Sequence, residues 1–375
     1  MDRRQTLAAM GAGLGVWRPA RAADGVTDTE VLLGQSGVLS GVLGVPVKAL
    51  LAGAQAAFDA VNAAGGVAGR RLRLLSLDDE LAPPKAVANY RTLLEQHKVF
   101  ALFACVGSGT TAAAAEVMQG TDAVTVGGYA VADSARERMG RSAFFVRATT
   151  RREAEVLVRQ LTTVGMTRIA MAHLDNAGGQ EALKLLADVL QASQLKPVGS
   201  AAIKGDGSNL GAQARELAAS NPQAVLMYLG GRLPADLMTA LRQAGSHPTF
   251  YGMSIVSGEI AAKALGEQAR GLAIAQVMPY PWFKGSPDLQ TYQRGIEKAG
   301  VGINYYSIEG WVNAQVLIEA LRRCDRDLTR ARFAAALRAL KTRIAGLDID
   351  FTAGGIAASR FVELVQVRSD GTFAR

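Results

Sequence analysis

Residues 99–118 read VFALFACVGSGTTAAAAEVM, and this stretch predicts a buried strand that runs directly into a helix. Its apolar beginning, rich in Val and Phe, is typical of a strand covered on both faces, and its alanine-rich end contains strong helix formers. Between them, Gly107 to Thr111 let the backbone approach a ligand and offer hydroxyls that cap a helix. Free N–H groups at a helix start favour an anion such as a carboxylate. The alternative is a capped turn that binds only water.

The length and composition indicate a two-domain globular protein. The chain has 375 residues, more than one ordinary core accommodates, so we expect two domains of about 150 residues. It is 49% apolar and 20% charged. The formal charge is +8, of which the first 22 residues contribute +3 through four arginines and one aspartate, leaving +5. The other basic residues fall in helical patterns without interleaved aromatic residues, which argues against nucleic-acid binding.

The N-terminus has the layout of an export signal. Arg3 and Arg4 precede an apolar run from Leu7 to Trp17, and residues 20–22 form an A-x-A cleavage site. We therefore expect residues 1–22 to be a signal peptide, cleaved near Ala22, and the mature protein to be soluble and extracytoplasmic. The apolar run is far shorter than the roughly 20 residues that span a bilayer. Twin-arginine and Sec export both stay open, since paired arginines also occur in ordinary secretory signals.

Residues typical of catalytic or metal sites are few and scattered. Cys105 and Cys324 match no metal spacing, and whether they pair stays open, although Cys105 falls in a buried strand. The three histidines are isolated from one another. No phosphate-binding G-x-x-x-x-G-K follows any expected strand, and the first strand lacks a dinucleotide-binding G-x-G-x-x-G. The sequence therefore predicts no catalytic residue, no metal and no cofactor.

Strands and helices alternate along most of the chain. Such alternation implies parallel sheets, because each crossover helix covers a sheet face. We expect strands at 30–33, 71–77, 99–106, 123–126, 143–147, 169–173, 198–203, 224–229, 249–253 and 272–277, and helices beginning at Pro46, Pro83, Arg151, Gln180, Asn209 and Asp236.

Two runs of this pattern, ending near residues 148 and 277, predict two similar lobes. The helices expected at 287–299, 307–323 and 329–340 bring almost no strands and need a sheet to cover. The simplest arrangement returns the chain to the first lobe before strands at 347–351 and 361–367 join the second. The expected lobes are therefore residues 29–148 with 278–344, and residues 149–277 with 345–375.

Several short segments follow one another in a recognisable order. The most specific runs from Val61 to Arg70 and contains Asn-Ala-Ala-Gly-Gly-Val-Ala-Gly-Arg; the others lie at 34–41, 77–79, 106–110, 144–147 and 307–311. The ordered set resembles the periplasmic solute-binding proteins of branched-chain amino-acid type ABC transporters, the leucine-binding-like group of type I periplasmic binding proteins. The resemblance runs from about Val31 to the end of the chain.

This resemblance implies an α/β fold of two Rossmann-like lobes with parallel sheets, joined by a hinge of three strands. The hinge is expected near Ala148–Thr149, Val277–Met278 and Ile344–Ala345, with the ligand enclosed between the lobes. The implied function is a monomeric periplasmic receptor that closes on a small carboxylate or amino-acid-like molecule. It would deliver this ligand to the permease and ATPase subunits of an ABC importer. A ligand-sensing receptor subunit and an exported α/β enzyme are the alternatives.

The family's ligand-binding positions transfer to the first lobe directly. Ser108 and Thr110, on either side of Gly109, stand where relatives offer a hydroxyl and a backbone N–H to a ligand carboxylate. Tyr129 and Ala130 stand where a second loop contributes main-chain groups. Both matches agree with the anion preference of a helix start.

In the second lobe the family pattern changes. Gly178 replaces a common tyrosine, and Arg232 stands where amino-acid binders often have an aromatic residue. Ser254 occupies the position of the acid that pairs with an amino-acid ammonium. A buried ammonium without that counter-charge costs several kcal/mol. We therefore expect a carboxylate without an ammonium group, unless Asp236 or Glu259 reaches the site.

Overall fold

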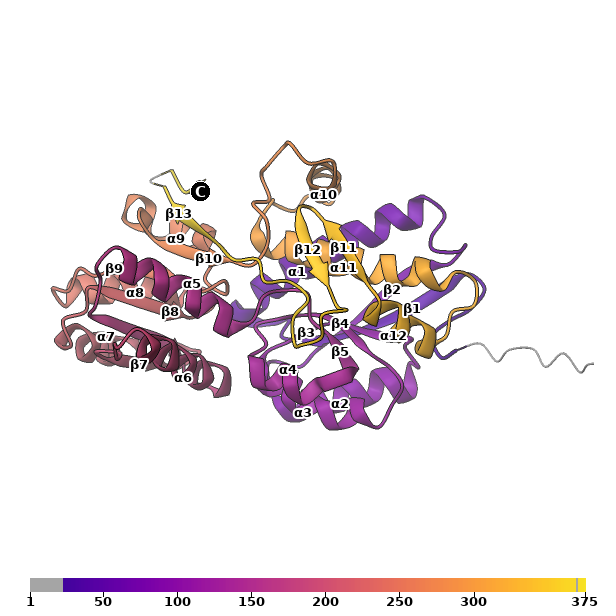
Figure 1. The fold of residues 1–375 in the computed structure, drawn as a ribbon, viewed down its shortest axis with the longest axis horizontal. Coiled ribbons are helices and arrows are strands. Elements are labelled where there is room, and N and C mark those ends of the chain that lie inside the picture. Colours follow the sequence, from indigo (N-terminus) through magenta and orange to yellow (C-terminus); the bar gives the residue numbers. More distant parts are fainter. Residues whose placement is uncertain (1–22, 369) are drawn as a thin grey trace, which may run out of the picture.

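The computed structural model describes residues 23–368 and 370–375, and the expected signal peptide lies outside these residues. The chain forms two lobes, each built around its own sheet (Figure 1). Among the described residues, no helix is long and apolar enough to cross a membrane.

The first lobe has a five-stranded parallel sheet in the order β2-β1-β3-β4-β5. Its strands are β1 (Glu30–Gly37), β2 (Arg71–Asp78), β3 (Ala101–Val106), β4 (Thr125–Tyr129) and β5 (Ala143–Phe144). Its helices are α1 (Gly41–Ala63), α2 (Pro83–Arg91), which continues as a π-helical turn (Thr92–Gln96), α3 (Ser108–Gln119), α4 (Asp133–Met139), a 3-10 turn (Gly140–Ser142), α10 (Pro287–Lys298), α11 (Tyr305–Cys324) and α12 (Arg330–Arg338).

Strand β3 is buried on both faces, as its apolar sequence predicts. Phe103 packs into the larger core with α1 and α11, whereas Leu102 and Cys105 pack into a second core with α2, α3 and α4. The two helix groups therefore cover opposite faces of the sheet (Figure 1).

The second lobe has a seven-stranded mixed sheet in the order β14-β13-β10-β9-β8-β6-β7. Its parallel part consists of β6 (Ile169–Leu174), β7 (Ser200–Ile203), β8 (Ala224–Tyr228), β9 (Thr249–Gly252) and β10 (Ala273–Gln276). The antiparallel edge consists of β13 (Glu363–Val367) and β14 (Phe373–Ala374). The helices are α5 (Thr150–Thr163), α6 (Ala177–Ala192), α7 (Leu210–Ala219), α8 (Leu233–Gln243), α9 (Gly258–Leu265) and a 3-10 turn (Gly266–Ala269).

The expected strand at 347–351 does not join the second sheet, so that prediction is wrong. Instead β12 (Leu347–Asp350) pairs with β11 (Lys341–Ile344) in a separate antiparallel hairpin. Ala345 and Gly346 between them both have positive φ, 53° and 87°, as a two-residue hairpin turn requires. The hairpin packs on the first lobe, where the Phe351 ring lies 5.4 Å from that of Phe144.

The chain crosses between the lobes three times among the described residues: between β5 and α5, between β10 and α10, and between β12 and β13. The third crossing therefore comes later than Ile344–Ala345, because the hairpin stays with the first lobe. Ala358 and Ser359 donate backbone hydrogen bonds to Phe145 and Val146, so the first and third crossings run side by side.

Two further differences concern helices near the cleft. Helix α1 begins at Gly41 rather than at Pro46, with the proline inside its first turns. Helices α4 and α9 were not expected from the sequence. Both are short, at 7 and 8 residues, and offer little periodicity to recognise.

Candidate functional site

A cavity of about 260 Å³ lies between the lobes, at the carboxyl ends of the parallel strands. The first lobe contributes residues from the ends of β1, β3 and β4 and from the starts of α1, α2 and α3. The second lobe contributes the ends of β6 and β8, the start of α6 and the loop after β9. The lining residues are Val38, Leu43, Pro46, Val47, Leu81, Pro83, Val106, Gly107, Ser108, Gly109, Thr110, Tyr129, Ala130, Leu174, Asn176, Ala177, Gly178, Tyr228, Gly230 and Ile255.

The start of α3 presents free backbone N–H groups to this cavity. Gly107, with a φ of 81°, turns the chain between β3 and α3. No acceptor among the described residues takes a hydrogen bond from the N–H groups of Ser108, Gly109 or Thr110. These groups lie at the positive end of a 12-residue helix and are oriented to bind an anion.

The hydroxyls of Ser108 and Thr110 are already bonded to the protein backbone. Ser108 Oγ donates to the Ala130 carbonyl at 3.3 Å and accepts from the Ala132 N–H at 2.9 Å. Thr110 Oγ1 contacts the carbonyls of Val106 and Gly107. The expected hydroxyl cap of α3 is therefore absent among these residues, and the N–H groups are the available donors.

A second helix start faces the same cavity from the other lobe. Helix α6 is capped by Asn176, whose side chain accepts from the Gly179 N–H at 2.9 Å. In the described structure the N–H groups of Ala177 and Gly178 have no such acceptor. The positive ends of two helix dipoles therefore converge from the two lobes.

The remaining wall described by the structure is mostly apolar, and its ionisable side chains are tyrosines. Among the described lining residues none is Asp, Glu, Lys, Arg or His. Tyr129 and Tyr228 supply one ring from each lobe, and burial raises the pKa of both phenols, so they stay neutral. The cavity thus offers N–H hydrogen-bond donors for an anion at the helix starts and mostly hydrocarbon surface elsewhere.

The structure brings five of the seven expected site residues together. Ser108, Gly109, Thr110, Tyr129 and Ala130 all line the cavity, where Ala130 has a φ of 53° at the end of β4.

Arg232 and Ser254 lie outside the cavity lining. The Arg232 side chain is 68% exposed, and its Nε bonds to Asp236 Oδ1 at 2.9 Å. Ser254 is buried, but its hydroxyl contacts Arg147 and its N–H donates to Glu153 at 2.7 Å. Neither Asp236 nor Glu259 reaches the lining, so the described lining residues supply no counter-charge for an ammonium.

Most of the apolar wall and the polar start of α6 were not predicted from the sequence. Leu43 was not expected to line the site because α1 begins at Gly41, before the expected start at Pro46. Asn176 and Tyr228 follow or end parallel strands of one sheet, and this topological signal would have found them.

The described residues contain no group of three or more His, Cys, Asp or Glu side chains that could hold a metal ion.

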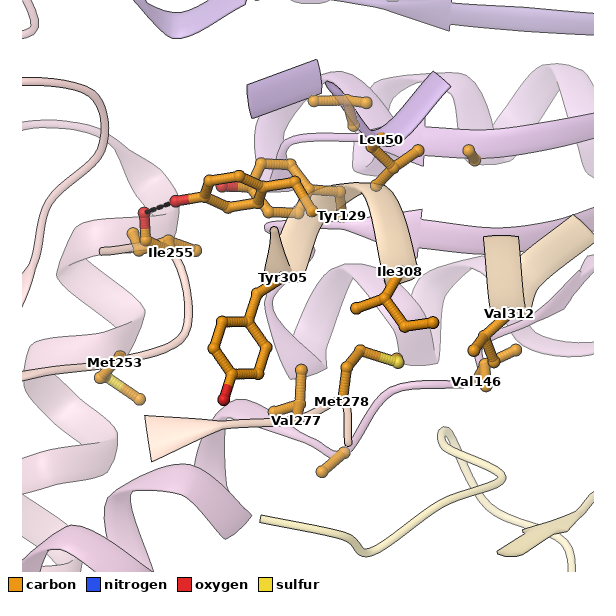
Figure 2. Packing of buried hydrophobic residues seen from close by; sticks show 14 of the residues in the cluster. Leu50, Tyr129, Val146, Met253, Ile255, Val277, Met278, Tyr305, Ile308 and Val312 are labelled. Carbon is orange, nitrogen blue, oxygen red and sulfur yellow. Dashed lines mark hydrogen bonds between the residues drawn. The ribbon is translucent and has the colours of Figure 1, made fainter. Parts of the chain in front are cut away.

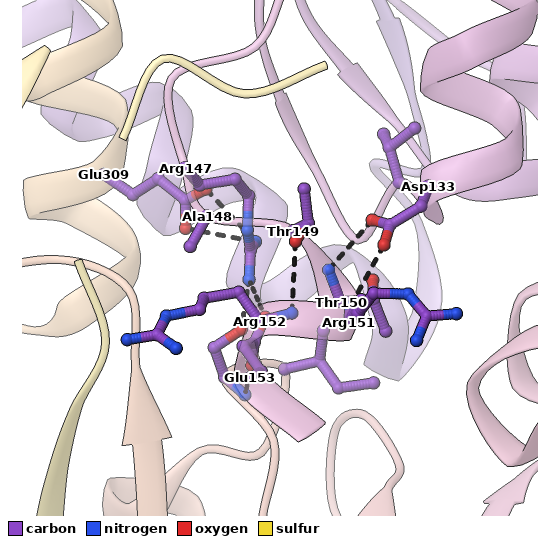
Figure 3. A network of polar contacts seen from close by, with 12 residues as sticks. Asp133, Arg147, Ala148, Thr149, Thr150, Arg151, Arg152, Glu153 and Glu309 are labelled. Carbon is purple, nitrogen blue, oxygen red and sulfur yellow. Dashed lines mark hydrogen bonds and ion pairs between the residues drawn. The ribbon is translucent and has the colours of Figure 1, made fainter. Parts of the chain in front are cut away.

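A buried ionic network lies at the first crossing between the lobes, with Arg147 over the ring of the lining residue Tyr129 (Figure 3). Arg147 Nη1 lies 3.1 Å from Glu309 Oε1 of α11, and Nη2 lies 3.5 Å from Glu153 Oε1 of α5. Burial raises the pKa of both glutamates, and the Arg147 charge opposes that rise. Arg136 donates to the carbonyls of Arg147 and Ala148 and so anchors the crossing to the first lobe.

A family model described as periplasmic binding protein matches residues 30–372. The chain belongs to this family of type I periplasmic binding proteins, and its α/β fold of two lobes is that of the family.

Individual relatives agree with this assignment. An amino acid binding protein of Pseudomonas aeruginosa is 27% identical over 250 residues, and the match spans 64% of each chain. A substrate-binding periplasmic protein of Ralstonia solanacearum superposes with a TM-score of 0.86 at 29% identity, covering 92% of this chain and 99% of the other. An extracellular ligand-binding receptor of Verminephrobacter eiseniae superposes with a TM-score of 0.85 at 26% identity, covering 92% of this chain and 100% of the other. The family and these relatives are binding and receptor proteins rather than enzymes.

Proposed function

We propose that this chain is the extracytoplasmic solute-binding subunit of an ABC importer and binds a small carboxylate without an ammonium group. The carboxylate accepts hydrogen bonds from the N–H groups of Ser108, Gly109 and Thr110. Tyr129 and Ala130 line the same end of the site, and the aliphatic or aromatic body of the ligand packs on the apolar wall. The expected partners are the permease and ATPase subunits of the importer, and the expected location is the periplasm.

The observation that supports this proposal is the pairing of free helix N–H groups with an uncharged wall. Hydrogen bonds to a charged group contribute about 1.5 to 3 kcal/mol each. An ammonium in the same cavity would face two positive helix ends and no carboxylate, which costs several kcal/mol. The amino acid binding relative therefore does not determine the ligand of this chain.

Mass spectrometry of co-purifying ligand tests the proposal. Native spectra of gently purified protein should show a bound small molecule, and spectra of the denatured sample should identify an organic acid that lacks a primary amine. A stoichiometrically bound amino acid would contradict the proposal.

A further inference from the structure

Two side chains of the first lobe contact one short segment of the second lobe beside the cavity. The segment is Ser254–Ile255, in the loop after β9. Arg147 contacts the Ser254 hydroxyl, and the Tyr306 hydroxyl donates to the Ile255 carbonyl at 3.2 Å. Figure 2 shows the second of these bonds next to Tyr129. We call Arg147, Tyr306, Ser254 and Ile255 the interlobe clamp.

The clamp is rigid on the side of the first lobe. Arg147 is 3% exposed, and within the first lobe its guanidinium lies 3.1 Å from Glu309 of α11 and 5.6 Å from the Tyr129 ring, whereas Glu153 at 3.5 Å belongs to α5 of the second lobe. Arg136 fixes the backbone of Arg147 to the first lobe at 3.0 Å. Tyr306 lies on α11 and is also buried. Both donors are therefore held by contacts within the first lobe.

The clamp also touches the cavity wall on both sides. The Ile255 side chain lines the cavity, so the clamped segment fixes part of the wall contributed by the second lobe. The Tyr129 ring, which lines the cavity from the first lobe, lies 5.6 Å from the Arg147 guanidinium and 5.6 Å from the Tyr306 ring. Closure of the lobes and assembly of the wall are thus one event.

We propose that Arg147 and Tyr306 are positioning residues that hold the lobes closed through Ser254–Ile255 and set ligand affinity without contacting the ligand. This inference rests on the proposed binding function. When only the closed form binds tightly, the apparent association constant is the intrinsic one multiplied by the fraction of molecules that are closed. The clamp raises the closed fraction before any ligand arrives.

Ser254 offers a cleaner test than Arg147. Truncating Arg147 would leave Glu153 and Glu309 buried without their counter-charge and would threaten folding. Ser254→Ala removes only the hydroxyl bonded to the guanidinium and leaves the Ser254 N–H bond to Glu153 in place. Tyr306→Phe removes the other clamp bond independently. The matched control is Ser220→Ala, because the Ser220 hydroxyl donates to the Leu217 carbonyl at 2.7 Å within the second lobe.

The experiment measures the distance between the lobes in ligand-free protein by double electron–electron resonance. Spin labels at Val45→Cys and Asp206→Cys report on the cleft mouth; Val45 is 55% exposed at the start of α1, and Asp206 is exposed in the loop after β7. The buried Cys105 and Cys324 do not compete for label.

The parent protein and Ser220→Ala should show a short-distance population. Ser254→Ala should lower the closed-to-open ratio by about tenfold, as expected for loss of a hydrogen bond to a charged group, and Tyr306→Phe should lower it in the same direction. Ser254→Thr, which restores a hydroxyl, should recover the short distance.

Two results would overturn the inference: a parent protein with no short-distance population, or Ser254→Ala and Tyr306→Phe distributions equal to that of Ser220→Ala. Because no ligand is present, either result would leave the ligand class of the proposed function untouched. Conversely, an error in the ligand class would not change these distances.

Discussion

Ser108 joins the two ligand-facing loops of the first lobe. Its hydroxyl donates to the Ala130 carbonyl and accepts from the Ala132 N–H, so it ties the start of α3 to the loop after β4. This bond also fixes where the hydroxyl points, and the helix N–H groups beside it stay free for an anion. At residue scale, the proposed selectivity for a carboxylate therefore comes from backbone rather than from side-chain charge.

The two cysteines give a direct prediction at this scale. Both are free and buried, and burial raises the pKa of the Cys105 thiol to about 11. A protonated thiol reacts poorly, because the thiolate is the nucleophile. In a thiol titration with Ellman's reagent at pH 8, the native protein should react slowly, and protein unfolded in guanidinium without reductant should release two equivalents. Fewer than two equivalents would show that the cysteines pair.

The side-chain contacts explain which site residues could be predicted from the sequence. Ser108 to Thr110 were recognisable because a strand, a glycine turn and a helix follow in order. Arg232 was expected in the site, but its guanidinium pairs instead with Asp236, four residues further along the same exposed turn. Ser254 was also expected in the site, but its hydroxyl contacts Arg147. This contact could not be predicted because the two residues lie 107 positions apart in the sequence and only the fold brings them together.

At the scale of elements, α1 and α11 pack with their backbones in close approach. A Cβ atom on Gly310 would lie 1.8 Å from the Leu50 carbonyl oxygen, and one on Gly53 would lie 1.8 Å from the Ser307 carbonyl oxygen. The two glycines therefore set the distance between these helices, and α11 carries Glu309 and Tyr306 toward the cleft.

Gly310→Ala should lower the free energy of unfolding by at least about 2 kcal/mol in urea denaturation, because backbone atoms would have to move apart. Alanine is intrinsically the better helix former, so the loss cannot come from helix propensity. Gly295→Ala in α10 is the control, since its Cβ would meet the Ala56 Cβ at an ordinary 3.4 Å. A Gly310→Ala protein as stable as this control would show that the helices are not in close contact.

Alternating strands and helices were predictable because each has its own hydrophobic period, whereas the hairpin β11–β12 was not. Its short strands lie after a long helical region, and the Ala345-Gly346 pair is a weaker turn signal than Asn-Gly or Asp-Gly. Because this hairpin was not expected, the predicted third crossing at Ile344–Ala345 lies too early in the chain.

At the scale of the whole molecule, the lobes meet where α3 and α6 face each other. A Cβ atom on Gly178 would lie 2.7 Å from Ser108 Oγ and 3.3 Å from Ser108 Cβ. The Ser108 side chain cannot easily turn away, because Ala130 and Ala132 hold its hydroxyl. The absence of a side chain at Gly178 thus permits the closed arrangement.

Gly178→Ala should hold the lobes apart without destabilising them. We expect a larger radius of gyration in small-angle X-ray scattering than for Gly211→Ala, together with an unchanged or slightly higher resistance to urea, since alanine favours the helix. Gly211 is the second residue of α7 in the same lobe, and its Cβ would lie 3.9 Å from Arg215 Nη1. Equal radii for the two variants would contradict this role of Gly178.

The most direct test of the central claim is a thermal-shift comparison of ligands that differ only in the ammonium group. The pairs are 4-methylpentanoate with leucine and 3-phenylpropanoate with phenylalanine, and 4-methylpentanamide tests the need for a charged carboxylate. A ligand at a hundred times its dissociation constant stabilises by about 2.7 kcal/mol, which raises the melting temperature measurably. We expect at least one of the two acids to raise the melting temperature, while its amino-acid counterpart and the amide do not. A rise with leucine or phenylalanine and none with the matching acid would contradict that claim.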